Sequence, residues 1–152
     1  MQVELYKEVN SPVQKGKVVQ LTRTALRALR QKKSINLSVA IVGEKTGKTL
    51  NKTWRGENNI PSVLSYEEKN PGKKSKIFIL PKQKEQFIGE IIITDSVVRK
   101  RAKTNKSSYL EEFEFLFIHG LLHLMGHTHK SSSKAKEMEK QEERILNLIH
   151  NT

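Results

Sequence analysis

The sequence contains no cysteine among its 152 residues. This absence excludes disulfide bonds, thiolate-held zinc or iron–sulfur centres and a thiol nucleophile. Long hydrophobic runs are also missing, because the most apolar segments, residues 91–93 and 113–125, fall short of the roughly 20 residues that span a bilayer. The N-terminal residues lack the apolar stretch of a signal peptide. We therefore expect a cytoplasmic protein without a membrane partner.

Acidic residues are few relative to basic ones, with 16 Asp and Glu against 28 Lys and Arg. The formal net charge of +12 predicts anionic partners, which are nucleic acid or acidic proteins. An anionic membrane surface is disfavoured, because the basic helices lack a large exposed apolar face. Aromatic residues make up only 6% of the chain, and no aromatic RNA-binding motif is present. Binding of nucleic acid would then depend mainly on phosphate contacts, which give affinity rather than sequence choice.

The spacing of apolar residues predicts one α+β domain over residues 1–152. Strands are expected at residues 2–9, 35–42, 77–80 and 87–94, and helices at 13–31, 45–54, 95–106, 109–125 and from 131 onward. The first helix is expected to open at Ser11-Pro12, and Ser108 with Glu111 fits a capping box. We predict a small mixed sheet of four to five strands packed by about five helices, with Ile91–Ile93 in a central strand covered on both faces.

Four of the five histidines lie within eleven residues, from His119 to His129. On a buried helix, His119 and His123 share one face with their Cβ atoms about 6 Å apart, so both imidazoles can reach one ion. Gly126 lets the chain leave this helix and turn back, which makes His129 the natural third ligand. Three imidazoles and an open fourth position are typical of a catalytic zinc site. The alternative is that the helical pair only packs in the core.

This spacing parallels the metzincin protease signature, in which a general-base Glu follows the first histidine. The sequence has Gly120 at that position, so a peptidase is disfavoured unless Glu112 serves as the base. Glu112 lies two helical turns before His119, and we interpret it as a helix-end charge or as support for a ligand. His127 has three open roles, as an exchanged ligand, a support for a ligand or a loop residue, and His150 is given no role.

The segment His119–His129 resembles the signature H-G-x-L-H-L-x-G-(Y/F)-D-H of the YbeY family of bacterial rRNA-maturation metallo-endoribonucleases. Residues 50–56, LNKTWRG, and residues 63–66, VLSY, are similar to two further blocks of that family with unchanged spacing. Residues 89–93, GEIII, resemble its G-D-I-x-I strand. The order and spacing of these blocks match the family from about residue 35 to the C-terminus.

The resemblance implies a zinc-dependent, single-strand-specific endoribonuclease that acts in 16S rRNA 3′-end maturation, ribosome assembly and ribosome quality control. It implies one zinc ion per chain, held by His119, His123 and His129, and a catalytic set completed by Arg55. A planar guanidinium can clamp the charged phosphodiester transition state bidentately, whereas the alternative for Arg55 is a surface salt bridge. The implied partners are rRNA and ribosomal particles, with ribosomal proteins or assembly factors.

The chain departs from the family pattern at His127-Thr128, where the family has an aromatic residue and Asp. That Asp would be a good hydrogen-bond partner for a ligand or for water, and without it no general base is assigned.

RNA phosphates are expected to contact basic clusters that include Arg23, Arg27, Arg30, Lys73, Lys74, Arg99 and Arg101. The helix face that carries the first three can instead be simply solvated. Trp54 and Tyr66 can either stack on a base or pack inside.

Two rival functions remain open from the sequence. A metallopeptidase-like hydrolase would cleave peptides and leave RNA intact. A ribosome-associated RNA-binding protein with a structural zinc would bind RNA whether or not Arg55 is present, and it would unfold when the metal is chelated.

Overall fold

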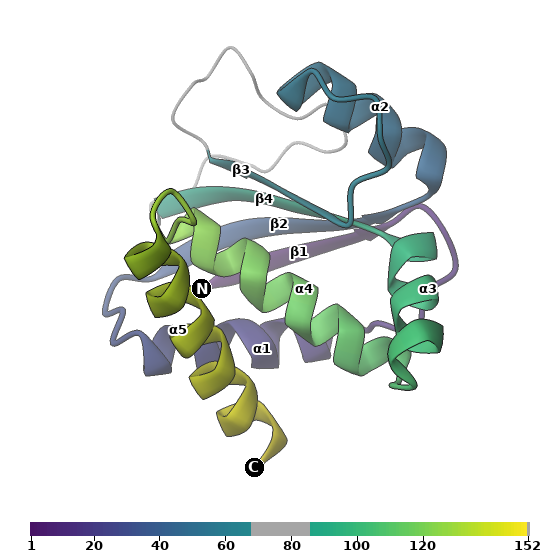
Figure 1. Cartoon of the computed structure of the whole chain (residues 1–152). Coiled ribbons are helices and arrows are strands. Elements are labelled where there is room, and N and C mark those ends of the chain that lie inside the picture. The colour runs from purple at the N-terminus through teal and green to yellow at the C-terminus, as the bar shows by residue number, and fades with distance from the viewer. Residues whose placement is uncertain (68–85, 152) are drawn as a thin grey trace.

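A computed structural model describes residues 1–67 and 86–151 of the chain (Figure 1). The strands are β1 (Gln2–Lys7), β2 (Ile35–Val42), β3 (Val63–Glu67) and β4 (Gln86–Thr94). The helices are α1 (Lys15–Ala28), α2 (Glu44–Arg55), α3 (Asp95–Asn105), α4 (Tyr109–Leu124) and α5 (Ser132–His150). The strand predicted at residues 77–80, and Lys73 and Lys74 of the predicted RNA surface, lie outside the described residues.

The four described strands form one mixed sheet in the order β1-β2-β4-β3. β1, β2 and β4 run parallel, and β3 pairs with β4 in the antiparallel direction. The predicted α+β class, with a mixed four-stranded sheet and five helices in this part of the chain, is confirmed. β3 is missing from the predicted strands because it is short. Leu64 is its one buried side chain among those described, so the strand shows no alternation of apolar and polar residues in the sequence.

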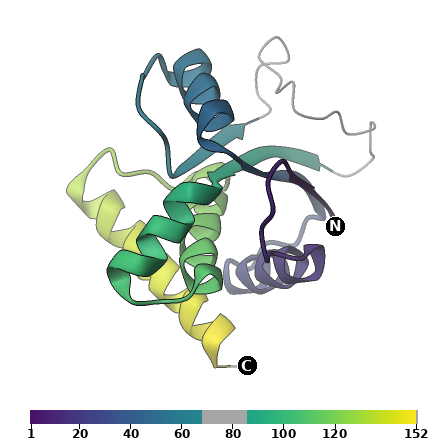
Figure 2. The ribbon, with the colours of Figure 1, turned by 90° about the vertical axis from the view of Figure 1, so that its right-hand side faces the viewer.

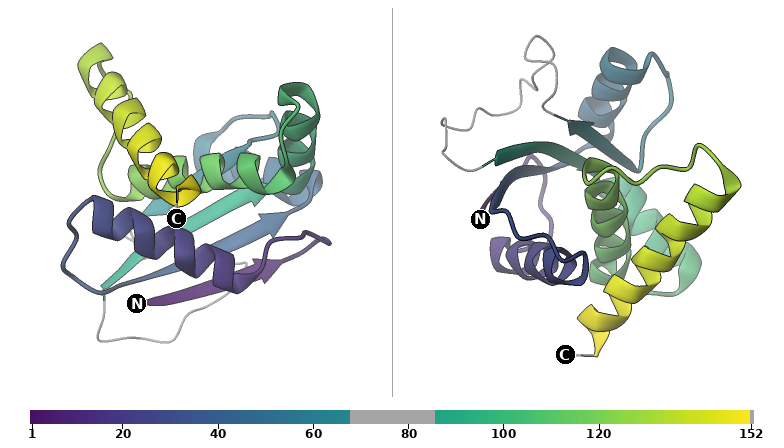
Figure 3. Two further views of the ribbon diagram at one scale, coloured as in Figure 1. Left: turned by 90° about the horizontal axis from the view of Figure 1, so that it is seen from below. Right: turned by 90° about the vertical axis from the view of Figure 1, so that its left-hand side faces the viewer.

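Helices cover both faces of the sheet, with α1, α4 and α5 on one side and α2 on the other (Figures 2 and 3). The larger core joins the first group to the sheet and contains Ile91 and Ile93 of β4. Ile92 lies in a smaller cluster on the opposite face, together with Leu50 and Trp54 of α2. Because successive strand residues point to opposite faces, the three isoleucines serve both layers. The prediction of a central strand covered on both faces is confirmed.

The first helix begins later than the sequence predicts. The Ser11 hydroxyl donates to the Tyr109 hydroxyl oxygen at 3.1 Å and accepts the backbone N–H of Val13 at 3.3 Å. Val13 is also fully buried, so this segment is held against the protein before a helix can start. The helix begins at Lys15, and the prediction that Pro12 stands in its first turn is wrong.

α4 is the buried helix that carries two of the clustered histidines. The Ser108 hydroxyl accepts the N–H of Glu111 at 3.1 Å, and the Glu111 carboxylate accepts the N–H of Ser108 at 3.4 Å, which confirms the predicted capping box. Phe113 and Phe117 stack inside the core with their ring centres 5.9 Å apart. No helix in the described ranges, residues 1–67 and 86–151, is long and apolar enough to cross a membrane.

Gly120 brings α4 into direct contact with the sheet. The Ser65 hydroxyl donates to the Gly120 carbonyl at 3.1 Å. A Cβ atom added to Gly120 would lie 3.1 Å from Cγ2 of Ile91 and 3.2 Å from Cγ2 of Val63, closer than ordinary van der Waals contact. The position that holds the general-base Glu in metzincins is therefore a packing position in this fold, with no room for a long side chain.

We expect Gly120→Leu to lower the free energy of unfolding by about 1–3 kcal/mol, because it overpacks the contact between α4 and the sheet. Urea unfolding followed by circular dichroism measures the change. The control is Gly16→Leu on α1, where an added Cβ has no atom within 4 Å, so stability should stay equal or rise. Equal losses in the two variants would contradict the close approach of α4.

Candidate metal centre

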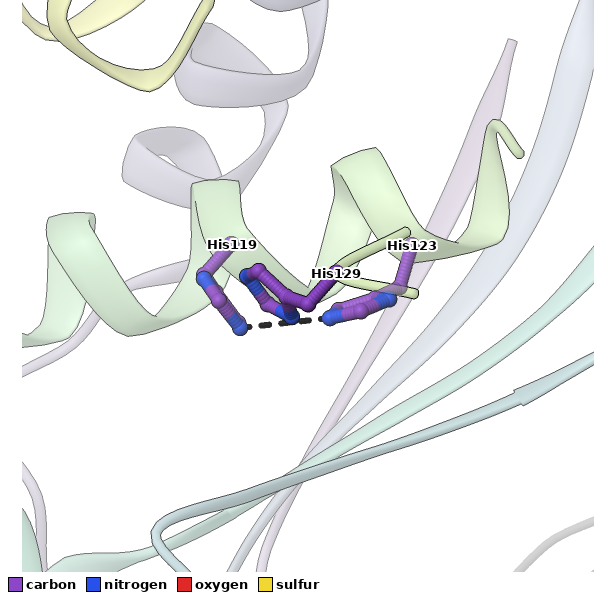
Figure 4. Close-up of side chains that lie close together, drawn as sticks. All are labelled: His119, His123 and His129. Carbon is purple, nitrogen blue, oxygen red and sulfur yellow. Dashed lines mark hydrogen bonds between the residues drawn. The ribbon is translucent and has the colours of Figure 1, made fainter. Parts of the chain in front are cut away.

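Three histidines converge at the C-terminal end of α4 (Figure 4). His119 and His123 lie one turn apart on the helix, and His129 comes from the segment that follows it. Gly126 has a φ of +98°, a left-handed conformation that lets the chain reverse after the helix. Each ring offers one nitrogen, and the three nitrogens lie within 4.8 Å of one another. The structure thus brings together the three residues predicted to bind one ion.

The arrangement of the three rings fits a tetrahedral metal ion. The ring centres of His119 and His123 are 4.8 Å apart, and each is 5.0 Å from that of His129. Three imidazoles bound to one tetrahedral ion through bonds of about 2 Å would hold their centres roughly 5 Å apart. The Nε2 atoms of His119 and His123 are 3.2 Å apart, which also suits two ligands of one ion. These residues could hold a metal with little rearrangement.

A buried carboxylate from α5 fixes the ring of His119. Nδ1 of His119 donates to Oε1 of Glu142 at 2.5 Å, since a carboxylate can only accept. With the proton on Nδ1, Nε2 keeps the lone pair that a metal requires and presents it to the other rings. Carboxylates placed in this way orient metal-binding histidines and raise their basicity.

Glu142 is absent from the site predicted from the sequence. It stands on the apolar stripe of α5, between Met138 and Ile145, and it is buried with them. A charged residue at a core position requires a partner in the core, and this was the available signal. The partner lies 23 residues earlier in the chain, so helical spacing alone does not identify it.

The surroundings of His123 favour its neutral form. Burial of the ring lowers the pKa of His123, and the adjacent rings of the other two histidines lower it further. Arg55 acts in the same direction, whereas a hydrogen bond with the backbone of His127 opposes the change. Neutral imidazole is the form that binds a metal ion, so the electrostatics of the site agree with its geometry.

The three rings open into a cavity of about 660 Å³. Its polar lining also includes Arg55, Ser62, Ser65, His127, Thr128 and Lys130. Among the described residues of this wall there is no Asp or Glu, so none of them supplies a carboxylate as general base. His127 lies in the wall but outside the three-histidine group. Thr128, at the position of the family Asp, accepts the N–H of Lys130 at 3.1 Å through its hydroxyl.

Arg55 reaches the same cavity from the end of α2. Gly56 follows it with a φ of +71°, and this left-handed residue ends the helix. Arg55 is exposed, and none of the ion pairs among the described residues includes it. The salt-bridge alternative therefore has no acidic partner within this part of the chain, and the guanidinium is available to an anionic ligand.

Glu112 lies away from the cavity, at the junction of α3 and α4. Its oxygens accept hydrogen bonds from the side chains of Ser107 at 2.6 Å, Arg101 at 3.0 Å and Asn105 at 3.2 Å. Burial alone would raise the pKa of Glu112, but these hydrogen bonds outweigh it and hold that pKa below its usual value. Glu112 is an ionised group that ties two helices together, so it is not a base for a peptidase.

Two arginines of the predicted RNA surface are engaged within the fold. Arg99 pairs with Asp95 at 3.0 Å and lies 5.1 Å from the centre of the Tyr109 ring. Arg101 pairs with Glu112 and lies 5.2 Å from the centre of the Phe115 ring. Both guanidinium groups already have an acidic and an aromatic partner, which leaves less of each available to RNA.

The other predicted RNA contacts lie far from α2. Arg23 and Arg27 are exposed on α1, on the opposite face of the sheet, and Arg30 follows that helix with a φ of +55° (Figure 1). Their binding to RNA stays a prediction.

Trp54 and Tyr66 are half-buried with their ring centres 4.8 Å apart, and Trp54 packs on the smaller core cluster. These contacts favour the packing interpretation for both rings.

We expect Glu142→Gln to raise the dissociation constant for zinc by about 10- to 100-fold, because an amide is a weaker acceptor for the His119 ring. Competition with a zinc-binding dye measures this constant. The control is Glu143→Gln, an exposed neighbour on the same helix that should bind zinc as the unchanged protein does. If the Glu142 variant kept full affinity, the carboxylate would have no part in the centre.

Comparison with known proteins agrees with this site. Residues 3–150 match the family model described as Endoribonuclease YbeY. The Endoribonuclease YbeY of Thermodesulfovibrio yellowstonii is 35% identical over 113 residues, which cover 72% of this chain but slightly less than two thirds, 64%, of the relative. That of Halorhodospira halophila is 32% identical over 72% of this chain and 68% of the relative. The solution structure of TM1509 from Thermotoga maritima shares the fold, with a TM-score of 0.57 and 20% identity over 99% of this chain and 93% of that one. The chain therefore belongs to the YbeY family of endoribonucleases.

Proposed function

We propose that this protein is a zinc-dependent endoribonuclease that cleaves single-stranded RNA. The observation that carries the proposal is a three-histidine centre that opens into a cavity also lined by Arg55. The family name supports the hydrolysis of RNA, and the net charge of +12 supports an anionic substrate.

The donor set suits zinc. Three neutral imidazoles with an open fourth position are a catalytic zinc arrangement, and His119, His123 and His129 would hold the ion here. When bound, zinc supplies a water molecule of pKa about 7 and a Lewis acid for a phosphoryl oxygen. Glu142 keeps the His119 ring oriented, and burial keeps His123 neutral, so both residues maintain the donor set at neutral pH.

Arg55 supplies the positive charge that a phosphodiester requires. In-line attack on the phosphorus concentrates negative charge on the phosphoryl oxygens, and a guanidinium can donate two parallel N–H bonds to them. Arg55 stands beside the histidines without a competing acidic partner among the described residues. Lys130 adds a second cation to the same wall. The cavity therefore binds the scissile phosphate and stabilises its transition state.

The metallopeptidase alternative is disfavoured by two residues. Gly120 occupies the position of the general-base Glu and is pressed against the sheet. Glu112, the substitute base, is held by three hydrogen bonds at the junction of α3 and α4. The described wall of the cavity has no carboxylate that could activate water against a peptide bond.

The alternative of a structural zinc is disfavoured by the open cavity. Structural zinc sites have four protein ligands and are closed. The described residues contribute three ligands to this centre, and its remaining side faces the cavity. We infer that this side receives water or substrate.

We further propose that the substrate is the 3′ region of 16S rRNA within ribosomal particles in the cytoplasm. Maturation of the rRNA, ribosome assembly and ribosome quality control are the processes that the family resemblance supports. Ribosomal proteins or assembly factors would then supply the specificity that a chain with 6% aromatic residues does not supply by itself.

The test is cleavage of a single-stranded rRNA fragment by the purified protein. We expect Arg55→Ala to lower kcat about 100- to 1,000-fold, because it removes a donor to the transition state. His123→Ala and a chelator should each abolish cleavage. Lys33→Ala, an exposed cation outside the cavity, is the control and should cleave at the normal rate.

The rival functions predict other outcomes of the same experiment. Chelator-sensitive cleavage of a peptide with no cleavage of RNA would establish the peptidase. Tight RNA binding that survives Arg55→Ala, with unfolding on chelation and no cleavage, would establish a binding protein with a structural zinc. Cleavage of RNA by the His123 variant would exclude the three-histidine centre as the catalytic site.

A further inference from the structure

Four cations share one flank of α2. Lys45, Lys48, Lys52 and Arg55 follow one another at intervals of three, four and three residues, the spacing that places side chains in one row along a helix. We call this row the α2 stripe. With a rise of 1.5 Å per residue, it extends for roughly 15 Å along the helix. The inward side of α2 is formed by other residues, such as Asn51 and Trp54.

The lysines of the α2 stripe have no acidic partner within residues 1–67 and 86–151. All three are exposed, and the ion pairs among the described residues include none of them. Glu44 lies in the first turn of the same helix, and none of the ion pairs among the described residues joins it to these lysines. Like charges three and four residues apart repel one another and weaken a helix. The three ammonium groups therefore point into solvent without an acidic partner among the described residues, where they can bind an anionic ligand from outside the protein.

The α2 stripe ends at the proposed catalytic cavity. Its last member, Arg55, lines that cavity together with the three histidines. Lys48 precedes Arg55 by seven residues, or two helical turns, so the two side chains leave the helix in nearly the same direction. The stripe therefore forms a continuous positive path along α2 that leads into the cavity.

We propose that Lys45, Lys48 and Lys52 bind consecutive phosphates of a single RNA strand and direct that strand to Arg55. This inference rests on the proposed function, because it takes the cavity as the site of RNA cleavage. Charge complementarity identifies the ligand, since the flank offers cations and no large apolar area. Arg23 and Arg27 on α1 lie on the opposite face of the sheet, so they cannot extend this path (Figure 2).

The test measures the salt dependence of RNA binding. Fluorescence anisotropy with a labelled, unstructured oligo(U) of about 20 nucleotides gives the binding constant over a range of salt concentrations. The variant is Lys45→Gln, Lys48→Gln and Lys52→Gln together. The control removes the same charge from the two ends of α1, with Lys15→Gln, Lys32→Gln and Lys33→Gln, all at exposed positions. A gel confirms that the RNA stays intact during the measurement.

We expect the α2 variant to reduce the slope of log K against log salt by about 2, since each phosphate contact on a single strand contributes about 0.7. At 0.1 M salt this corresponds to a loss of affinity of roughly 100-fold. The α1 control should retain most of its affinity and its slope. Replacing the same α2 lysines by arginine should preserve binding, and unchanged circular dichroism shows that the variants fold.

Two results would overturn the proposal. One is an α2 variant that binds oligo(U) as tightly as the unchanged protein. The other is an equal loss in the α1 control, which would show that net charge rather than the α2 stripe determines affinity. Binding is measured separately from cleavage. A protein that binds RNA through the α2 stripe but cleaves no RNA would overturn the proposed function, while the proposal that these lysines bind RNA would be supported.

Discussion

The contact between α4 and the sheet is the constraint on which the rest of the site depends. Gly120 lets the helix backbone reach β3, where its carbonyl accepts a hydrogen bond from Ser65. His119 and His123 lie on either side of this glycine along the chain, so the same contact fixes their position. β3 is one of the two edge strands of the described sheet, and Ser65 also lines the cavity. At that edge Arg55, from the helix on the opposite face, can share a cavity with histidines of α4.

The sequence predicts well those features that are local along the chain. The three histidines lie within one segment of eleven residues, and the periodicity of one helix with the glycine turn after it is enough to bring them together. The capping box and the strand at residues 35–42 are equally local, and the structure has both as predicted. The predicted start of α1 is wrong because the segment before the helix is held by Tyr109, which lies 98 residues from Ser11 in the chain.

Features that join distant parts of the chain are beyond this kind of prediction. Arg101 looks like a surface cation in the sequence, yet it pairs with Glu112 on the next helix. Glu142 looks like one of many charges on α5, yet it holds a histidine of α4. The edge strand β3 has too few buried side chains among those described to show the alternation of apolar and polar residues that predicts a strand. In each case the determining partner lies on another element, and only the packed structure shows which one it is.

Several acidic residues are buried inside the protein. Glu112, Glu114 and Glu142 are all buried, although each carries a carboxyl group. Glu114 lies 3.6 Å from the Lys17 ammonium and 3.4 Å from Nε2 of His150, so it links α4 to both α1 and α5. Because these carboxylates face the interior, the solvent-facing surface carries a larger excess of basic groups than the composition alone suggests. Such an excess strengthens the positive field around the molecule.

The hydrogen bond between His119 and Glu142 joins the candidate metal centre to the docking of α5. The same helix is held on α1, where the Arg144 guanidinium donates to the carbonyl of Ala28. Local opening of α5 would take the carboxylate away from the His119 ring and leave that ring without the group that orients it. Docking of α5 and affinity for a metal ion are therefore thermodynamically linked, and an ion bound by the three histidines would stabilise the docked helix.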